Sequence, residues 1–233
     1  MKHLPNYLLI VALLLFAVSP CLTIAADQPA SPFPADGQPP KDATVLFNGK
    51  DISQWTNDKG APCKWKVDKN EMLITNGGGS AISKHKFTNA MIHLEFNLPT
   101  SGQGHGNSGV YVHQLYELQI IDSFNKNKFA PGQQCGSLYK KHTPIKQMCK
   151  APGQWQSYDI LFRAATINKA GKLVTPAMFT VWHNGTLILK DAAMSKGTGG
   201  AAKRPLVNKG PLLLQNHGAP VRFRNIWIQS IDK

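Results

Sequence analysis

The sequence predicts an all-β protein, an antiparallel β-sandwich of the jelly-roll type, and three observations support this prediction. Short segments rich in Ile, Val, Leu, Phe, Trp and Tyr recur along the chain between clusters of Gly, Asn, Pro and Lys. No long segment shows the 3.6-residue period of an amphipathic helix. Because there are many strands and no crossover helices, two packed antiparallel sheets are expected.

The expected strands follow one another over most of the chain, and residues such as Asn70, Asn184 and Gly218 supply turns between them. They are KWKV (64–67), EMLIT (71–75), AMIHLEFNL (90–98), SGVYVH (108–113), YELQIID (116–122), QSYDILFRA (156–164), AMFTVWHNG (177–185), TLILKD (186–191), PLLLQNH (211–217) and VRFRNIWIQSI (221–231).

Residues 1–26 have the organisation of a signal peptide. Lys2 and His3 precede an apolar run over residues 7–18, and small residues lead to Ala26. The run is shorter than the roughly 18 to 20 residues that cross a bilayer, so we expect no membrane span and a secreted or periplasmic protein. Acylation at Cys21 is an alternative that the preceding Pro20 disfavours.

The rest of the chain divides into a short segment and one domain. Residues 27–41 are rich in Pro and small polar residues, which predicts a flexible segment. Residues 42–233 are enough for a single domain with a sizeable core.

The chain is basic, with 26 Lys and Arg against 13 Asp and Glu, and a formal net charge of +13. The lysines are scattered and form no basic helix, zinc module or RNA motif, so we expect a solvated surface and no nucleic-acid partner. Five histidines, at positions 85, 105, 113, 142 and 183, fall in loop-like or strand-end contexts and are interpreted as surface residues.

Three cysteines remain after removal of the signal peptide, and an odd number leaves one of them unpaired. Cys135 and Cys149 flank a short polar loop, and closing such a loop contributes on the order of 3 kcal/mol. We therefore predict a Cys135–Cys149 disulfide and a free Cys63.

Strand alternation places polar side chains on the outer faces of four strands. In residues 90–98, Ile92, Leu94 and Phe96 are expected to face the core, with His93, Glu95 and Asn97 facing away. The same reasoning puts Glu117 with Gln119, Gln215 with His217, and Arg222 with Arg224, the last pair opposite Phe223 and Trp227. A solvated face would favour Thr, Lys and Ser, whereas these groups bind hydroxyls, metals or protons.

Several of these segments resemble a known family. QGHGNSGVYVHQLYELQIIDS, WQSYDILF, FTVWHNGTLI and LLLQNHGAPVRFRNIWI are similar to the 3-keto-disaccharide hydrolase domain. The resemblance extends over about residues 44–231 and implies a concanavalin-like jelly roll that cleaves glycosides oxidised to a ketone at sugar carbon 3. The sequence departs from the family pattern at Asn216, where the family usually has Asp, and in the stretch KGTGGAAKRPLVNKG.

A ketone at carbon 3 acidifies the proton on carbon 2, so the protein must supply a base, stabilisation for an enolate and an acid for the leaving oxygen. Glu117 is the first candidate for the base, and His217 for a proton donor or metal ligand. Asp122 is a further catalytic candidate or a turn residue. The candidates for substrate binding are Glu95, Asn107, Gln119, Gln215 and Arg224.

A divalent metal ion would stabilise the enolate, and its candidate ligands are Glu95, Glu117 and His217. We expect these residues and Arg224 to converge on one sugar-sized depression. The expected partners are an oligosaccharide or glycoside and, functionally, a sugar 3-oxidising enzyme. The structural alternative is that Glu117 forms an ion pair with Arg222 or Arg224.

Two other function classes remain open. A conventional glucanase-like hydrolase needs two carboxylates across the scissile bond, and Glu117 and Asp122 fall on opposite faces of their segment. A non-catalytic carbohydrate-binding module would use the same sandwich without a base.

Overall fold

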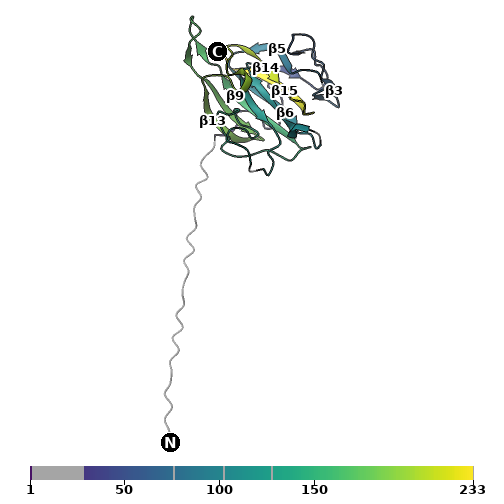
Figure 1. The fold of residues 1–233 in the computed structure, drawn as a ribbon, viewed down its shortest axis with the longest axis vertical. Coiled ribbons are helices and arrows are strands. Elements are labelled where there is room, and N and C mark those ends of the chain that lie inside the picture. The colour runs from purple at the N-terminus through teal and green to yellow at the C-terminus, as the bar shows by residue number, and fades with distance from the viewer. Residues whose placement is uncertain (2–28, 76, 102, 127, 233) are drawn as a thin grey trace.

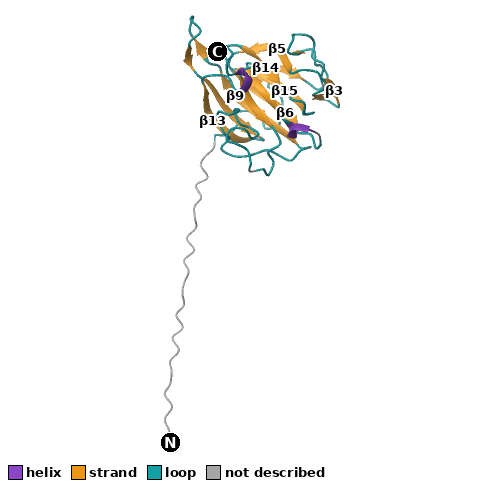
Figure 2. Cartoon of the chain, viewed as in Figure 1, coloured by secondary structure: helices purple, strands orange, loops and turns teal. Residues whose placement is uncertain are grey.

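The computed structural model describes residue 1 and residues 29–75, 77–101, 103–126 and 128–232. Strands dominate this part of the chain, and its only helical segments are two short 3-10 turns, η1 (Gln103–Gly106) and η2 (Gly199–Ala201) (Figure 2). Among the described residues, no helix has the length and apolar character needed to cross a membrane. Apart from Met1, the predicted signal peptide lies outside the described residues.

The strands form two main sheets in which every pairing is antiparallel (Figure 1). The eight-stranded sheet has the order β13-β12-β9-β6-β15-β4-β3, with β1 also paired to β15, and the five-stranded sheet has the order β2-β5-β14-β7-β8. The strands are β1 (Thr44–Phe47), β2 (Trp55–Thr56), β3 (Lys66–Asp68), β4 (Glu71–Leu73), β5 (Ala81–Phe87), β6 (Ala90–Asn97), β7 (Ser108–Val112), β8 (Tyr116–Ile120), β9 (Trp155–Arg163), β12 (Ala177–His183), β13 (Thr186–Met194), β14 (Gly210–Leu214) and β15 (Arg222–Ser230), and a separate small hairpin pairs β10 (Thr166–Ile167) with β11 (Leu173–Thr175).

The core lies between the two sheets. Phe87 of β5 contacts Phe162 of β9 edge to face with ring centroids 6.2 Å apart, and Tyr116 of β8 contacts Phe179 of β12 at 5.6 Å. Such aromatic pairs across the interior are what a sandwich of two amphipathic sheets produces. The predicted all-β antiparallel sandwich is confirmed.

Strand alternation is correct for β6, whose side chains at 92, 94 and 96 are fully buried in the core. It fails in the second half of β15. Arg224 pairs with Glu95 but Trp227 pairs with His93, so β15 has one residue more than β6 between these pairs. This bulge contains Asn225 in a left-handed conformation, φ 48°. The prediction placed Trp227 on the face opposite Arg224. Because one extra residue reverses the alternation, Trp227 instead lies on the outer face with His93.

The segment before the domain also differs from its prediction. Of residues 27–41, those from 29 onward pack on the outer face of the eight-stranded sheet. Phe33 is buried between Trp182 and Trp227, with ring centroids 6.0 and 5.9 Å away. The carbonyl of Gly37 accepts hydrogen bonds from Asn225 and from the Trp227 indole, both at 2.9 Å. One aromatic anchor therefore orders a segment whose composition suggested flexibility, and its prolines reduce the entropy lost on docking.

Candidate active site

Glu117 lies on the outer face of the five-stranded sheet and is nevertheless buried, with 4% of its surface exposed. Its cross-strand partner on β7 is Tyr111, whose hydroxyl donates a hydrogen bond to Glu117 Oε2 over 2.8 Å. A Cβ at the neighbouring Gly109 would lie 2.7 Å from Glu117 Oε1. The glycine therefore makes the space that the carboxylate occupies, which explains a residue that otherwise weakens a strand.

The surroundings of Glu117 favour its protonated form. Burial raises the pKa of this carboxyl to about 6, although the Tyr111 hydrogen bond and the charge of His217 act in the opposite direction. The pKa of Tyr111 is raised well above its usual range by burial and by the adjacent carboxylate, so the phenol stays a hydrogen-bond donor. A carboxylate whose pKa approaches neutrality is suited to general-base catalysis.

Two amides flank this carboxylate. Gln119 follows Glu117 on the same face of β8, and Gln215 donates a long hydrogen bond of 3.4 Å to the Tyr111 hydroxyl. The side-chain oxygens of both amides are buried and have no hydrogen-bond partner in the described structure. Buried acceptors without partners are unusual, and ligand hydroxyl groups are suitable donors for them.

The loop between β13 and β14 packs over the same carboxylate. The hydroxyl of Thr198, itself fully buried, accepts a hydrogen bond from the Glu117 amide at 2.9 Å. A Cβ at Gly199, which has φ +45°, would lie 3.7 Å from Glu117 Oε2 and 3.5 Å from the Tyr139 ring. The stretch that departs most from the family pattern therefore borders Glu117.

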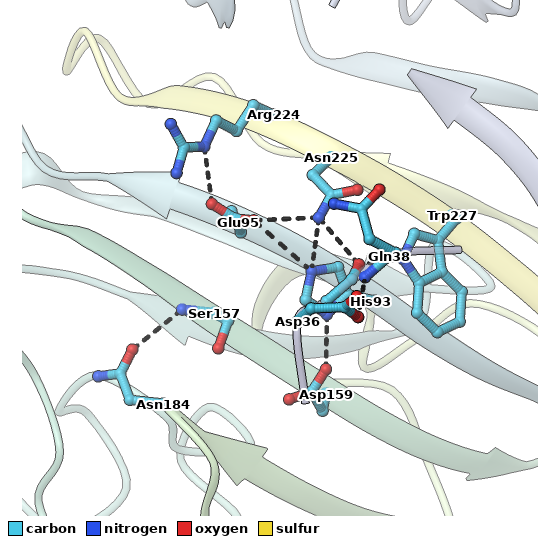
Figure 3. Close-up of polar contacts among 11 residues, drawn as sticks. Asp36, Gln38, His93, Glu95, Ser157, Asp159, Asn184, Arg224, Asn225 and Trp227 are labelled. Atoms are coloured by element: carbon cyan, nitrogen blue, oxygen red, sulfur yellow. Dashed lines mark hydrogen bonds and ion pairs between the residues drawn. The ribbon is translucent and has the colours of Figure 1, made fainter. Parts of the chain in front are cut away.

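A second polar cluster lies on the outer face of the eight-stranded sheet (Figure 3). His93 Nδ1 contacts Asp159 Oδ1 at 2.6 Å, and Arg224 Nε donates to Glu95 Oε2 at 2.7 Å. Asn225, projecting from the bulge in β15, links the two pairs through contacts with His93 Nε2 at 3.2 Å and Glu95 Oε1 at 3.0 Å. His93 also stacks on Trp227 with ring centroids 5.3 Å apart.

The charges of this second cluster are mutually stabilised. Burial alone would raise the pKa of Glu95, but hydrogen bonds from His93, Asn225 and Arg224 lower it to about 2. Burial alone would lower the pKa of His93, yet the hydrogen bonds with Asp159 and Glu95 raise it overall. Both nitrogens of the His93 ring have partners, and a Cβ at Gly37 would lie 3.1 Å from the ring, so His93 has no free nitrogen for a substrate.

A cavity of about 600 Å³ opens beside this cluster, bordered by Asp36, Trp155, Asn184 and Arg224 among others. The Arg224 guanidinium lies over the Trp155 ring at 4.0 Å from its centroid. The docked segment around Phe33 and Gly37 forms one wall. The cluster therefore anchors that segment and shapes the cavity.

The predicted convergence on one depression is wrong. Glu117, Gln119, Gln215 and His217 belong to the five-stranded sheet and its β14 extension, whereas Glu95 and Arg224 lie on the opposite sheet. Outward-facing side chains of the two layers point away from each other. The ion pair suggested between Glu117 and Arg222 or Arg224 is also wrong, because Arg222 pairs with Glu71 at 3.0 Å and Arg224 with Glu95.

This separation also bears on the predicted metal site. Glu95 cannot share an ion with Glu117 and His217 across the thickness of the sandwich. Within the described ranges, no group of three or more His, Cys, Asp or Glu side chains is placed to hold a metal. The proposed ligand set therefore does not fit one divalent cation.

The remaining candidates lie at the margins of the site. His217 is exposed, and its interaction with Glu117 is electrostatic, without a hydrogen bond in the described structure. Asp122, just beyond β8, forms an ion pair with Lys126 at 2.5 Å and accepts a turn hydrogen bond from the Phe124 amide, which matches the turn role. Asn107 precedes β7 and is partly exposed.

Asn216 is held away from this face. Its side-chain amide donates to the Thr75 carbonyl at 3.0 Å, and its backbone amide donates to the Ser80 hydroxyl at 3.3 Å. These contacts agree with the expectation that Asn216 and His217 point in opposite directions.

Cys135 and Cys149 are both free, and so is Cys63, so the predicted disulfide is not formed in this structure. The two thiols are nevertheless neighbours, and the proximity of Cys135 lowers the pKa of Cys149 to about 7, against the effect of burial. The predicted disulfide is therefore not borne out, although its two residues lie close together. The Cys135 thiol also contacts the Tyr158 hydroxyl at 3.0 Å. That hydroxyl donates a hydrogen bond to the backbone carbonyl of Gln119, on the strand that carries Glu117.

Sequence reasoning missed Tyr111, Thr198, Asp159 and Asn225. Tyr111 could have been predicted, because the short connection between β7 and β8 fixes their register and places Tyr111 opposite Glu117. Asp159 and Thr198 become partners only through pairings distant in sequence, 66 residues in the case of His93 and Asp159. No local signal indicates such contacts.

Comparisons with known proteins define the class first. A crystal structure from Parabacteroides distasonis, described as that of a candidate glycosyl hydrolase, superimposes with a TM-score of 0.79 at 33% identity, covering 88% of this chain and 92% of that one. A second structure from the same species has a TM-score of 0.65 at 23% identity, covering 82% and 94%, and shows the shared fold. The protein is therefore a carbohydrate-active β-sandwich of the glycoside hydrolase type.

The family follows from two further matches. A model of the 3-keto-alpha-glucoside-1,2-lyase-like domain matches residues 42–229, and the chain belongs to this family. A 3-keto-disaccharide hydrolase of Bacteroides thetaiotaomicron is 24% identical over an alignment of 244 residues. The match covers 86% of this chain and 81% of that protein. The resemblance inferred from the motifs is confirmed.

Proposed function

We propose that this protein cleaves glycosides whose sugar carries a ketone at carbon 3, with Glu117 as the base. The observation that carries the proposal is a buried carboxylate with a pKa of about 6, paired to a phenol and flanked by amides with unpartnered oxygens. The family membership and the name of the relative support the substrate class.

The reaction begins with removal of the carbon 2 proton by Glu117 Oε1, the oxygen that does not accept the Tyr111 hydrogen bond. The electron pair of the C–H bond moves to form an enolate on the carbon 3 oxygen. It returns to form a C1=C2 double bond as the C1–O bond breaks, and the leaving oxygen takes up a proton. Addition of water across the double bond completes a net hydrolysis. Because the ketone creates the acidity, an unoxidised sugar lacks this route.

The neighbouring groups have corresponding roles. Tyr111 holds the carboxylate in place through the other oxygen, and a fixed base contributes both orientation and proton transfer. Gln119 and Gln215 accept hydrogen bonds from sugar hydroxyls through their free oxygens. His217, exposed beside the carboxylate, supplies the proton to the leaving oxygen.

Two further parts of the proposal come from the sequence. We propose that residues 1–26 direct export and are removed, so that the mature chain starts near Asp27. We also propose that an enzyme oxidising sugars at carbon 3 supplies the substrate. Sequencing the amino terminus of exported protein tests the first point.

The decisive experiment compares a 3-keto disaccharide with its unoxidised counterpart, each with and without a chelator. We expect cleavage of the oxidised sugar alone. Equal turnover of the two would replace the proposal with a conventional hydrolase, and binding without cleavage of either would indicate a binding module. Loss of turnover on chelation would require a metal site other than the predicted ligand set.

A further inference from the structure

A cavity of about 380 Å³ lies beside the turn that joins β7 to β8, on the sheet that carries Glu117. Its lining includes three cationic side chains, Lys86, Arg204 and Lys209, and no carboxylate. None of the three forms an ion pair within the described part of the chain. The cavity therefore combines like charges without a counter-ion.

The three cations come from different segments of the fold. Lys86 lies on β5 opposite Pro211 of β14, and Lys209 immediately precedes β14. Arg204 extends from the β13–β14 loop and donates to the carbonyl of Gln114 over 3.2 Å. Convergence of like charges raises the local electrostatic potential, and a bound anion would lower the free energy of the arrangement.

The turn beside the cavity is strained. His113 and Gln114, in the three-residue connection between β7 and β8, both have φ of 56°, a left-handed conformation that Asn or Gly adopts at lower cost. Strain of this kind persists where the surrounding structure imposes it, and it concentrates at ligand-binding sites. Replacing both residues with better turn formers would relieve the strain, so their presence here needs another reason.

His113 is itself unusual. It lines the cavity, only 3% of it is exposed, and neither ring nitrogen has a hydrogen-bond partner. The carbonyls of Phe87 and Val207 lie near the ring, but not in hydrogen-bonding geometry. His113 and His183 were both expected at the surface, and both are buried.

The cavity and the candidate base are connected through Arg204. Its charge acts on the hydroxyl of Tyr111, the group that donates to Glu117. The loop between them is fixed at both ends, since Thr198 accepts from the Glu117 amide and the Arg204 amide donates to the Ala201 carbonyl at 3.0 Å. A ligand bound in the cavity would therefore lie near the proposed reaction site.

We propose that this cavity binds the oxyanion of an acidic sugar, a carboxylate or a sulfate ester, so that the protein selects acidic glycosides as substrates. The volume is within the range of cavities that hold small ligands. Charge-assisted hydrogen bonds from Arg and Lys recognise such groups. The selection of substrates rests on the proposed function, whereas the binding of the oxyanion does not.

Calorimetric titration of the mature protein with methyl glucuronide, glucose 6-sulfate and methyl glucoside tests the binding. We expect at least one of the two anions to bind ten times more tightly than methyl glucoside, with an affinity that falls as salt is added. Arg204→Gln and Lys209→Gln should each weaken that binding about tenfold, as expected for one charge-assisted hydrogen bond. Lys190→Gln, an exposed lysine of β13 on the other sheet, should leave it unchanged.

The two anions distinguish the sources of the oxyanion: preference for the glucuronide assigns a carboxylate, and preference for the sulfate assigns a sulfate ester. Equal binding of all three sugars, or no effect of Arg204→Gln and Lys209→Gln, would overturn the site. A separate assay compares 3-keto glycosides with and without the acidic group. Equal kcat/KM for the two would overturn substrate selection, while failure of both to react, with anion binding intact, would count against the proposed function alone.

Discussion

The two outer faces of this sandwich carry polar clusters with opposite electrostatic character. On the eight-stranded sheet, Glu95 and His93 are surrounded by partners that stabilise their charged forms. On the five-stranded sheet, Glu117 is more deeply buried, and its pKa moves toward neutrality. The same residue type, glutamate on an outer strand face, therefore has a pKa of about 2 in one place and about 6 in the other.

The difference teaches which cluster can do chemistry. A carboxylate held by an arginine, an amide and an imidazole is a poor base, because accepting a proton would break these interactions. A desolvated carboxylate has a higher proton affinity and an oxygen left for the substrate. Pairing thus marks the structural cluster, and incomplete pairing marks the candidate site.

The largest expected effect is that of Glu117→Gln, which keeps the shape of the side chain and removes the base. Turnover of a 3-keto glycoside should fall by about 10² to 10⁴, the usual contribution of general-base catalysis. The same change should stabilise the fold at pH 8. The folded pKa of about 6 exceeds the usual value of 4.5, so the wild-type protein loses roughly 2 kcal/mol as pH rises through this interval.

Steady-state kinetics and denaturant unfolding at pH 4 and pH 8 measure both effects. Asn216→Asp is the matched control, because residue 216 points away from Glu117. The change removes the amide donor to the Thr75 carbonyl and should cost some stability, but turnover of the folded protein should change little. Wild-type turnover in Glu117→Gln would remove Glu117 from the mechanism. A large gain in turnover in Asn216→Asp would show that the side chain of residue 216 points toward the reaction site and not away from it.

The second effect concerns the support beneath the candidate site. Oxidising Cys135 and Cys149 to a disulfide should stabilise the protein by about 3 kcal/mol, since it closes a short loop in the unfolded chain. Cys149→Ser should lose this gain under oxidising conditions, whereas Cys63→Ser should keep it. Non-reducing peptide mapping after oxidation verifies the bond, and unfolding with and without a reductant measures the gain. Equal stability of the oxidised and reduced proteins would contradict the prediction.

The third effect tests the structural cluster. Glu95→Gln should destabilise the fold by about 1 to 3 kcal/mol, because it leaves Arg224 without its partner in a partly buried site. Turnover at saturating substrate should stay within a few-fold of the wild type. The Glu95 pKa lies below its usual value, so its contribution is present above about pH 4.5 and is lost as pH falls toward 2. Normal stability with lost turnover would reverse the roles of the two clusters.

The smallest effect is that of Tyr111→Phe, which removes one hydrogen bond to Glu117. That bond lowers the pKa of the carboxyl, so its loss should move the acidic limb of the kcat/KM profile above pH 6, by up to about one unit. A pH profile of kcat/KM between pH 4 and 9 provides the measurement. An unchanged limb would mean that the profile reports another group.

The candidate site was only partly predictable. Glu117 was identified because alternation places it on the polar face of its strand beside Gln119, in a segment that resembles the family, and Gln215 followed from the same alternation. The convergence with Glu95 and Arg224 was wrong because alternation tells which residues share a face of one strand, but not which sheet the strand joins. Only the pairing of β8 with β7 and of β15 with β6 places them on opposite sides.

The sequence by itself determined the fold class, the family and the inward residues of β6, because these depend on local periodicity and on motifs contiguous in the chain. The tertiary structure decided the ion pairs, the position of Trp227 and the docking of Phe33. One bulge residue reverses a face, and one aromatic anchor orders a Pro-rich segment. Such outcomes depend on contacts between distant segments, and no window of sequence contains both partners.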